Sequence, residues 1–180
     1  MSSPHRHRTL VAPILALLCA VLITTAAHAQ DESAYPTLGI GGNVGFQKLA
    51  SSNGLLELGF DMPLYLNEHF SVGPWMQLGL SQDIVNLIVT GNMRWHFDFM
   101  ERTRFNKVRP FVQGGLGLVY TKVGGSKATD FTMNMGFGAE VPVTDHVYLG
   151  SDFMFSPILT RPSGGNWAFS WQFLTLRYRF

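Results

Sequence analysis

The sequence predicts an all-β protein whose antiparallel strands close into a barrel, and three observations lead to this fold class. After residue 30, apolar and polar residues alternate with a period of two, as they do along strands whose two faces meet different surroundings. Glycine-rich or polar breaks interrupt the alternation, at residues 51–54, 67–68, 124–126, 144–145 and 163–166. No apolar run after residue 30 approaches the roughly 18 residues of a membrane-spanning helix.

Composition limits the chain to a few classes of protein. Its 180 residues are about one domain, and only 14% of them are charged, against about 25% in soluble domains. With 46% hydrophobic residues the chain is not disordered, and the formal net charge of +1 argues against a basic nucleic-acid binder. The single cysteine excludes an intrachain disulfide framework and a cysteine zinc site.

The first 29 residues have the pattern of a secretory signal peptide. A short basic segment precedes an apolar run at residues 9–27, which ends in the A-x-A pattern of a cleavage site at residues 27–29. A transmembrane anchor is the alternative, but no cluster of positive charge follows the run. We therefore predict a cleaved signal peptide at residues 1–29 and a single β-barrel domain at residues 30–180.

The first four strands are predicted at residues 38–46, 56–66, 70–81 and 86–97. Each has an apolar face, and in chain order these faces hold Leu38, Ile40, Val44 and Phe46; Leu56, Leu58, Phe60, Met62, Leu64 and Leu66; Phe70, Val72, Met76, Leu78 and Leu80; Leu87, Val89, Met93, Trp95 and Phe97. Gly, Ser, Asn, Gln, Thr and a few charged residues dominate the opposite faces. Because Pro63 and Pro74 cannot donate to a strand ladder, we expect a bulge near the hairpin that contains them.

The last four strands follow a charged connector and are predicted at residues 110–121, 131–140, 147–155 and 167–180. Their apolar faces hold Val112, Leu116, Leu118 and Tyr120; Phe131, Met133, Met135 and Phe137; Val147, Leu149, Phe153 and Phe155; Leu174, Leu176, Tyr178 and Phe180. A tilted strand needs about 9 to 11 residues to cross a membrane, and these strands are long enough. Eight is also the smallest common number of strands in membrane barrels.

The two faces differ so strongly that they predict which one meets lipid. The apolar face carries about five large residues per strand, and Lys48 is the one charged residue in its phase. The lumen of an eight-stranded barrel is just wide enough for side chains to fill, so it could not hold that many large groups. The sequence therefore predicts a transmembrane barrel with lipid outside and polar packing inside. A soluble, lipocalin-like periplasmic barrel is the alternative.

With both termini on the periplasmic side, odd strands run outward and even strands run inward, and we expect short periplasmic turns and longer extracellular loops. Membrane barrels place aromatic residues at both interfaces, and this orientation produces two such girdles. The periplasmic girdle holds Phe70, Trp95, Phe97, Tyr178 and Phe180, and the outer girdle holds Phe46, Tyr120, Phe131 and Phe155.

Two stretches resemble a known family, the small OmpA/OmpX-type barrels of the bacterial outer membrane. Residues 109–117, RPFVQGGLG, resemble the family's strand after the midpoint turn, and residues 176–180, LRYRF, resemble its carboxyl end. The resemblance implies a place in the outer membrane after export. Tyr178 and Phe180 resemble the signal that the outer-membrane assembly machinery reads. Members of the family serve in adhesion, structural support, resistance to host factors and lipid modification, so the resemblance fixes no activity.

Charged residues on the inward face are candidates for a network inside the barrel, because buried charges need partners. They are Glu57, Asp61, Arg94, His96, Glu140, Asp152, Arg177 and Arg179. Position along the strands puts Asp61 and Asp152 near mid-depth, and it puts the basic residues, with Glu140, toward the periplasmic end. We interpret the set as an ion-pair network that plugs the lumen. A catalytic or proton-linked site is the alternative.

The sequence favours a structural or surface-interaction role over an enzyme. A lipid A-modifying or phospholipid-modifying barrel needs a nucleophile or base, yet residues 148–153, which correspond to the His-x-Ser stretch of a deacylase, contain no histidine. His69 and His146 fall in predicted turns and His96 at a strand end, and we interpret all three as surface residues. We expect no catalytic residue, metal site or cofactor. A narrow channel or small-ligand binder stays open, because many glycines face the lumen.

Basic residues of the proposed outer loops, Lys122, Lys127 and Arg161, are candidates to contact lipopolysaccharide phosphates. Residues 156–166 form the longest proposed outer loop, which is the best candidate for contact with a partner. We expect outer-membrane lipid, lipopolysaccharide and the outer-membrane assembly machinery as partners, with no nucleic acid. The expected state is a monomer.

Overall fold

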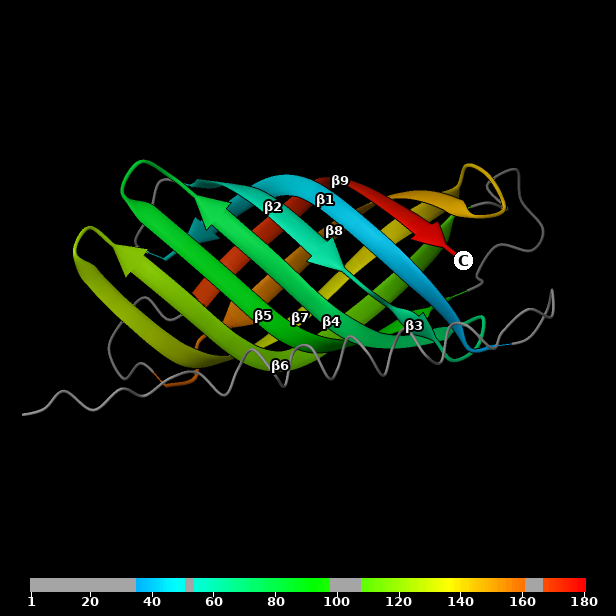
Figure 1. Cartoon of the computed structure of the whole chain (residues 1–180), viewed down its shortest axis with the longest axis horizontal. Helices are drawn as coiled ribbons and strands as arrows, with labels where there is room; N and C mark the ends of the chain where they lie inside the picture. Colours follow the sequence, from blue (N-terminus) through cyan, green and yellow to red (C-terminus); the bar gives the residue numbers. More distant parts are fainter. Residues whose placement is uncertain (1–34, 51–53, 98–107, 161–166) are drawn as a thin grey trace, which may run out of the picture. The chain divides into compact units, whose positions relative to one another are not determined.

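The computed structural model describes residues 35–50, 54–97, 108–160 and 167–180, so the predicted signal peptide lies outside the described residues. From Pro36 onward the chain forms one compact unit. The described residues form nine β-strands (Figure 1): β1 (Thr37–Leu49), β2 (Leu55–Asp61), β3 (Leu64–Tyr65), β4 (Phe70–Leu80), β5 (Ile84–His96), β6 (Arg109–Val123), β7 (Ser126–Pro142), β8 (Val147–Pro157) and β9 (Trp167–Arg179). In this part of the chain, no helix is long and apolar enough to cross a membrane.

Antiparallel pairing between neighbours closes these strands into a barrel. Each strand from β4 to β8 pairs with the next one along the chain, and β1 pairs with β9. Figure 1 shows β1 and β9 side by side at this seam. β2 and β3 both lie between β1 and β4, so they act as one interrupted strand. The predicted eight-stranded antiparallel barrel is therefore confirmed.

The irregularity expected at the two prolines is a break in a strand and not a bulge. β2 and β3 pair with β4 in the same register, so no residue is added at Met62 and Pro63, which lie between them. The Met62 N–H donates to the Pro74 carbonyl at 3.1 Å. Gly73 allows this close approach, because a Cβ at Gly73 would meet the Met62 carbonyl oxygen. Proline has no N–H for the ladder, which explains why the strand stops at Pro63.

A bulge is present in β9, where the sequence analysis expected none. The register between β8 and β9 shifts between Gly150 and Asp152, and the register between β1 and β9 shifts at the same level. Both shifts add one residue to β9. As a result, the neighbouring residues Phe173 and Leu174 both face outward and are both exposed. The alternation of β9 thus changes phase once, while its large apolar residues stay on the outer surface.

The two faces of the wall are arranged as the alternation predicts. Phe131, Phe137 and Leu116 are 59%, 60% and 66% exposed on the outer surface, whereas Glu57 and His96 are fully buried in the lumen. A soluble barrel buries its large apolar side chains, so the lipocalin-like alternative is wrong. The exposed apolar surface is suited to contact with lipid.

Glycines of the inward face make room for side chains from neighbouring strands. A Cβ at Gly41 would meet the side chain of Asp61, and a Cβ at Gly59 would meet the side chain of Asn43. Small residues thus lie beside large polar ones, and the space beside each glycine is occupied. At these positions the glycines do not form the channel or ligand cavity that the sequence analysis left open.

The two ends of the lumen are closed by different residues. The hairpin end, as we call the end with the β4–β5 and β6–β7 turns, has a buried apolar cluster of Leu49, Leu55, Ile88, Val119, Ile158 and Ala168. The opposite end, which we call the terminal end, contains the β3–β4 and β7–β8 turns and Phe180. Tyr65 and Phe111 are buried near this terminal end.

Among the hairpins that the structure describes in full, the predicted contrast between short periplasmic turns and longer extracellular loops does not hold. Residues 66–69 and 143–146 connect strands at the terminal end, and the shorter segments 81–83 and 124–125 connect them at the hairpin end. The chain at the hairpin end is extended as strand, because β6 and β7 stay paired as far as Val123 and Ser126. The expectation of longer loops is therefore wrong for these two hairpins.

Candidate functional site

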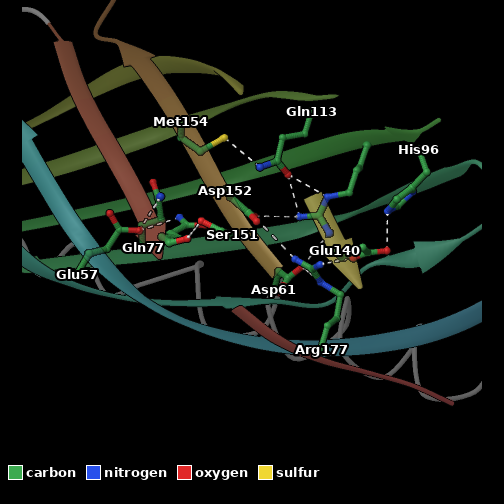
Figure 2. A network of polar contacts seen from close by, with 12 residues as sticks. Glu57, Asp61, Gln77, His96, Gln113, Glu140, Ser151, Asp152, Met154 and Arg177 are labelled. Carbon is green, nitrogen blue, oxygen red and sulfur yellow. Dashed lines mark hydrogen bonds and ion pairs between the residues drawn. The ribbon is translucent and has the colours of Figure 1, made fainter. Parts of the chain in front are cut away.

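Arg177 on β9 is the centre of an ion-pair network inside the barrel. Its Nε donates to Asp61 Oδ2 at 3.0 Å, and its Nη1 donates to Glu140 Oε2 at 2.8 Å. Its Nη2 lies 3.9 Å from Asp152 Oδ2. Figure 2 shows the three carboxylates converging on this guanidinium from separate strands. Because Arg177 is 2% exposed, the carboxylates of β2, β7 and β8 stabilise a buried cation.

Arg94 on β5 is the second cation of the network. Its Nη2 and Nε both donate to Gln113 Oε1, at 2.8 Å and 3.1 Å. Its Nη1 lies 3.5 Å from Asp61 Oδ2, and its Nη2 lies 3.9 Å from Asp152 Oδ2. The guanidinium carbon is 4.6 Å from the centre of the Phe111 ring, which covers one face of the cation. Two carboxylates are thus shared by both arginines.

His96 extends the network toward the terminal end. Its Nε2 lies 2.9 Å from Glu140 Oε1, within hydrogen-bond distance. The ring packs between Tyr65 and Phe111, with centroids 6.2 Å and 5.5 Å away. The interpretation of His96 as a surface residue is wrong, because its strand-end position is covered by these two aromatic rings. His69 and His146 lie in exposed turns.

Glu57 belongs to a separate group, made of amides. Gln77 Nε2 and Gln172 Nε2 both donate to Glu57 Oε1, at 2.9 Å and 2.8 Å (Figure 2). All three residues are at most 1% exposed. The carboxylate of Glu57 is therefore held by neutral donors, whereas the carboxylates around Arg177 are held by charge.

Neutral hydrogen bonds continue from Glu57 toward the hairpin end. Asn86 donates to Gln47 Oε1 at 2.8 Å and accepts from Thr121 Oγ1 at 2.9 Å. Asn134 Nδ2 donates to Thr90 Oγ1 at 2.8 Å. These contacts join β1, β5, β6 and β7, and they fill the part of the lumen next to the apolar cluster.

Two of the carboxylates contact cations that the sequence analysis placed at another depth. Asp61 and Asp152 were expected near mid-depth, but both lie beside Arg94 and Arg177 in one cluster. Barrel strands tilt and are staggered against one another, so equal counts from the strand ends do not give equal depth. The stagger brings side chains from different positions along their strands to the same level.

Arg179, the last of the expected lumen charges, lies outside the Arg177 cluster. It is partly exposed, its Nε donates to Thr37 Oγ1 at 3.2 Å, and its guanidinium carbon is 4.5 Å from the centre of the Tyr65 ring. The expected assembly signal is next to it. The rings of Tyr178 and Phe180 are 5.1 Å apart on the outer surface, and both are exposed.

The lysines proposed to contact lipopolysaccharide lie directly opposite each other at the hairpin end. Lys122 of β6 pairs with Lys127 of β7, and both side chains are exposed. They follow Tyr120 in the outward phase, so they lie just beyond the apolar band. Arg161, the third proposed contact, lies outside the described residues.

The serine of the stretch compared with the deacylase is engaged in hydrogen bonds. Ser151 Oγ donates to the Gln172 carbonyl at 2.9 Å and accepts from Trp171 Nε1 at 3.2 Å. This arrangement satisfies the Trp171 N–H within the wall. In the described part of the chain, no group of three or more His, Cys, Asp or Glu side chains is placed to hold a metal ion.

Several members of the lumen packing were not among the expected site residues. Gln113 and Gln77 lie in the inward phase of their strands, so the alternation contained the signal that could have found them. Phe111 and Tyr65 also lie in the inward phase of their strands, but they were not among the expected site residues because only charged residues were taken as candidates for the lumen. Gln172 was missed because the bulge in β9 reverses the phase of residues that precede it.

The closed sheet, its apolar outer surface and its charged interior define a small transmembrane β-barrel. Residues 16–180 match the model of the outer membrane protein beta-barrel domain family, and the chain belongs to this family. It is thus a β-barrel of the bacterial outer membrane, as the resemblance implied. No curated relative matches the chain in sequence.

Solved structures with a similar fold come from several bacteria. Neisserial surface protein A is 16% identical, with a TM-score of 0.60 over 80% of this chain and 96% of that chain. The N-terminal β-barrel domain of OprF from Pseudomonas aeruginosa is 13% identical, with a TM-score of 0.55 over 79% and 97%. Ail, the attachment invasion locus protein of Yersinia pestis, in complex with the heparin analogue sucrose octasulfate, is 14% identical, with a TM-score of 0.53 over 80% and 97%. At these identities the likeness concerns the fold alone.

Proposed function

We propose that this protein has a structural or surface-interaction role in the outer membrane and that its lumen is plugged and is not a wide pore. The observation that carries the proposal is the network around Arg177, which joins β2, β7, β8 and β9 across the interior. A plugged interior leaves the ends and the outer surface of the barrel as the parts that partners can reach.

Electrical recording in planar bilayers tests the plug. We expect no sustained stepwise conductance from the folded protein, because buried side chains occupy the lumen. Folding is checked on the same sample by its different migration on gels before and after boiling. A stable open channel in the folded native protein would overturn the proposal.

A contact with lipopolysaccharide is the surface interaction that the charges favour. Lys122 and Lys127 are like charges directly opposite each other, which repel unless an anion lies between them. Their place beyond the apolar band is the level of lipid phosphates. Ail, a barrel of similar fold, was solved with the polyanion sucrose octasulfate. We propose that the lysine pair binds phosphate groups of lipopolysaccharide in the outer leaflet.

Vesicles that contain lipid A, with and without its phosphate groups, test this contact. We expect tighter association of the folded protein with the phosphorylated lipid, and we expect the double variant Lys122→Gln, Lys127→Gln to lose most of that difference. Equal association of native protein with both lipids would contradict the contact.

Export and assembly complete the proposal. Cleavage after Ala29 would leave Gln30 as the first residue of a mature, monomeric barrel, and Phe180 would be read by the assembly machinery. Mass spectrometry of protein from outer-membrane fractions tests the cleavage site. Removal of Phe180 should lower the amount of heat-modifiable barrel in cells without lowering synthesis.

A further inference from the structure

The methionines of the barrel are divided unequally between its two faces. Met154 is 1% exposed in the lumen, and its sulfur accepts a hydrogen bond from Gln113 Nε2 at 3.0 Å (Figure 2). Met76, Met93 and Met135 lie on the outer surface and are 42%, 58% and 47% exposed. Three thioether side chains are therefore open to the membrane, whereas that of Met154 is enclosed and hydrogen-bonded.

Two glycines leave the side chain of Met93 open. Met93 and Met135 are the two neighbours of Gly114 in one row across β5, β6 and β7. Because Gly114 has no side chain, no group at this position of β6 separates the two methionines. Gly91 precedes Met93 by two residues on the same face of β5, and a Cβ at Gly91 would meet no atom within 4 Å. The missing side chains on both sides explain why Met93 is the most exposed of the three.

The surroundings of the three exposed methionines are apolar, which selects the kind of oxidant that can reach them. Their neighbours in the outward phase carry no charge; they are Pro74 and Leu78 beside Met76, Gly91 and Trp95 beside Met93, and Met133 and Phe137 beside Met135. A water-soluble oxidant must lose its hydration to enter this band. An oxidised lipid is already within it, so a lipid-borne oxidant is favoured over one from water.

We propose that Met76, Met93 and Met135 are modification sites that reduce lipid hydroperoxides, with Met93 as the most reactive. The thioether sulfur attacks the terminal oxygen of the hydroperoxide, and the O–O bond breaks. The sulfur is oxidised to the sulfoxide, the hydroperoxide is reduced to the alcohol, and the hydroperoxide proton moves to the alkoxide oxygen. Each sulfur removes one hydroperoxide, and the reaction needs no other reactant. This proposal does not depend on the plugged lumen or on the lysine pair.

Mass spectrometry of the full, folded barrel in vesicles of saturated phosphatidylcholine tests the proposal. Linoleic acid hydroperoxide is added to the vesicles, and the sulfoxide content of each methionine-containing peptide is followed with time. We expect Met93 to be oxidised at least tenfold faster than Met154, and we expect the hydroxy acid to form in the same amount as sulfoxide. Hydrogen peroxide at the same total concentration should oxidise Met93 at least tenfold more slowly. Equal rates for Met93 and Met154, or equal rates with the two oxidants, would overturn the proposal.

Leucine variants assign the consumption of hydroperoxide to these sulfurs. Leucine has nearly the volume of methionine, so we expect the triple variant Met76→Leu, Met93→Leu, Met135→Leu to fold into a heat-modifiable barrel. It should consume linoleic acid hydroperoxide at least threefold more slowly than the native protein. Met154→Leu is the matched control and should leave the consumption unchanged, because Met154 is buried. Unchanged consumption by the folded triple variant would reject the sites, and the comparison of Met93 with Met154 in the native protein needs no variant to fold.

Discussion

The two halves of the lumen are packed with different chemistry. Near the terminal end, Arg94 and Arg177 share carboxylates from several strands. Toward the hairpin end, neutral amides such as Gln47 and Asn86 bond to one another beside an apolar cluster. Both halves fill the interior, but only the first depends on a balance of charge.

The difference matters because a buried charge and a buried amide respond differently to the loss of a partner. Removal of one member of a buried ion pair leaves an uncompensated charge and costs about 3–5 kcal/mol. Loss of a neutral hydrogen bond leaves an unsatisfied group and costs about 1–3 kcal/mol. We therefore expect the charged half to dominate the stability of the barrel, and the following substitutions are arranged from the largest expected effect to the smallest.

Arg177→Met should be the most destabilising change. It removes the guanidinium that holds Asp61, Glu140 and Asp152, so we expect the free energy of unfolding to fall by about 3–5 kcal/mol. Urea titration of the barrel in lipid vesicles measures this change. A loss of less than 1 kcal/mol would mean that the charged half is not the main support of the fold.

Arg94→Ala should lower stability by about 2–4 kcal/mol, because it removes the bonds to Gln113 and leaves Asp61 and Asp152 with one arginine. Lys122→Ala is the control on the exposed hairpin, and its effect should stay within about 0.5 kcal/mol. Thermal unfolding followed by gel migration compares them. Equal effects would be inconsistent with the assignment of Arg94 to the lumen.

Gly73→Ala tests the wall break, which lies beside the charged half. A Cβ at Gly73 would meet the Met62 carbonyl oxygen, so we expect a loss of about 1–3 kcal/mol from overpacking. Gly91→Ala is the matched control, since a Cβ at Gly91 would meet nothing within 4 Å. Urea titration measures the unfolding midpoints of both variants. Equal midpoints would contradict the close packing of Met62 against Gly73.

Glu57→Gln should have the smallest effect of the four. An amide oxygen at this position can still accept from Gln77 and Gln172, so we expect a change below about 1 kcal/mol. Glu140→Gln provides the contrast within the charged half, where it should cost more, because Glu140 pairs with Arg177. Similar losses in both variants, measured by urea titration, would remove the distinction between the two halves.

The alternation of residues was enough to predict the strands and their facing, because a lipid-facing wall repeats every two residues. It did not predict which charges meet. Asp61 and Asp152 reach the arginines through the tilt and stagger of the strands, and these are properties of the closed barrel. The bulge in β9 was also hidden, because Phe173 and Leu174 are both apolar and either one continues the pattern.

Pro63 and Pro74 predicted an irregularity in the strand ladder, but the sequence could not distinguish a bulge from a break in the strand. The outcome depends on Gly73, whose missing side chain lets Met62 approach the neighbouring strand without an added residue. The β6–β7 hairpin was expected to have a longer loop because residues 121–128 are mostly polar. A polar segment can form either a loop or a strand that extends beyond the membrane, and here it forms paired strand.

The seam between β1 and β9 has a consequence for how the chain folds. Arg179 and Thr37, which meet there, are 142 residues apart in the sequence. Arg177 is on the same final strand, so Asp61 and Asp152 have only Arg94, and Glu140 has no arginine, until β9 docks. Closing of the seam therefore also completes the neutralisation of the interior. Contacts of such long sequence separation fold slowly, and a nascent barrel without its last strand would present an open, acidic interior.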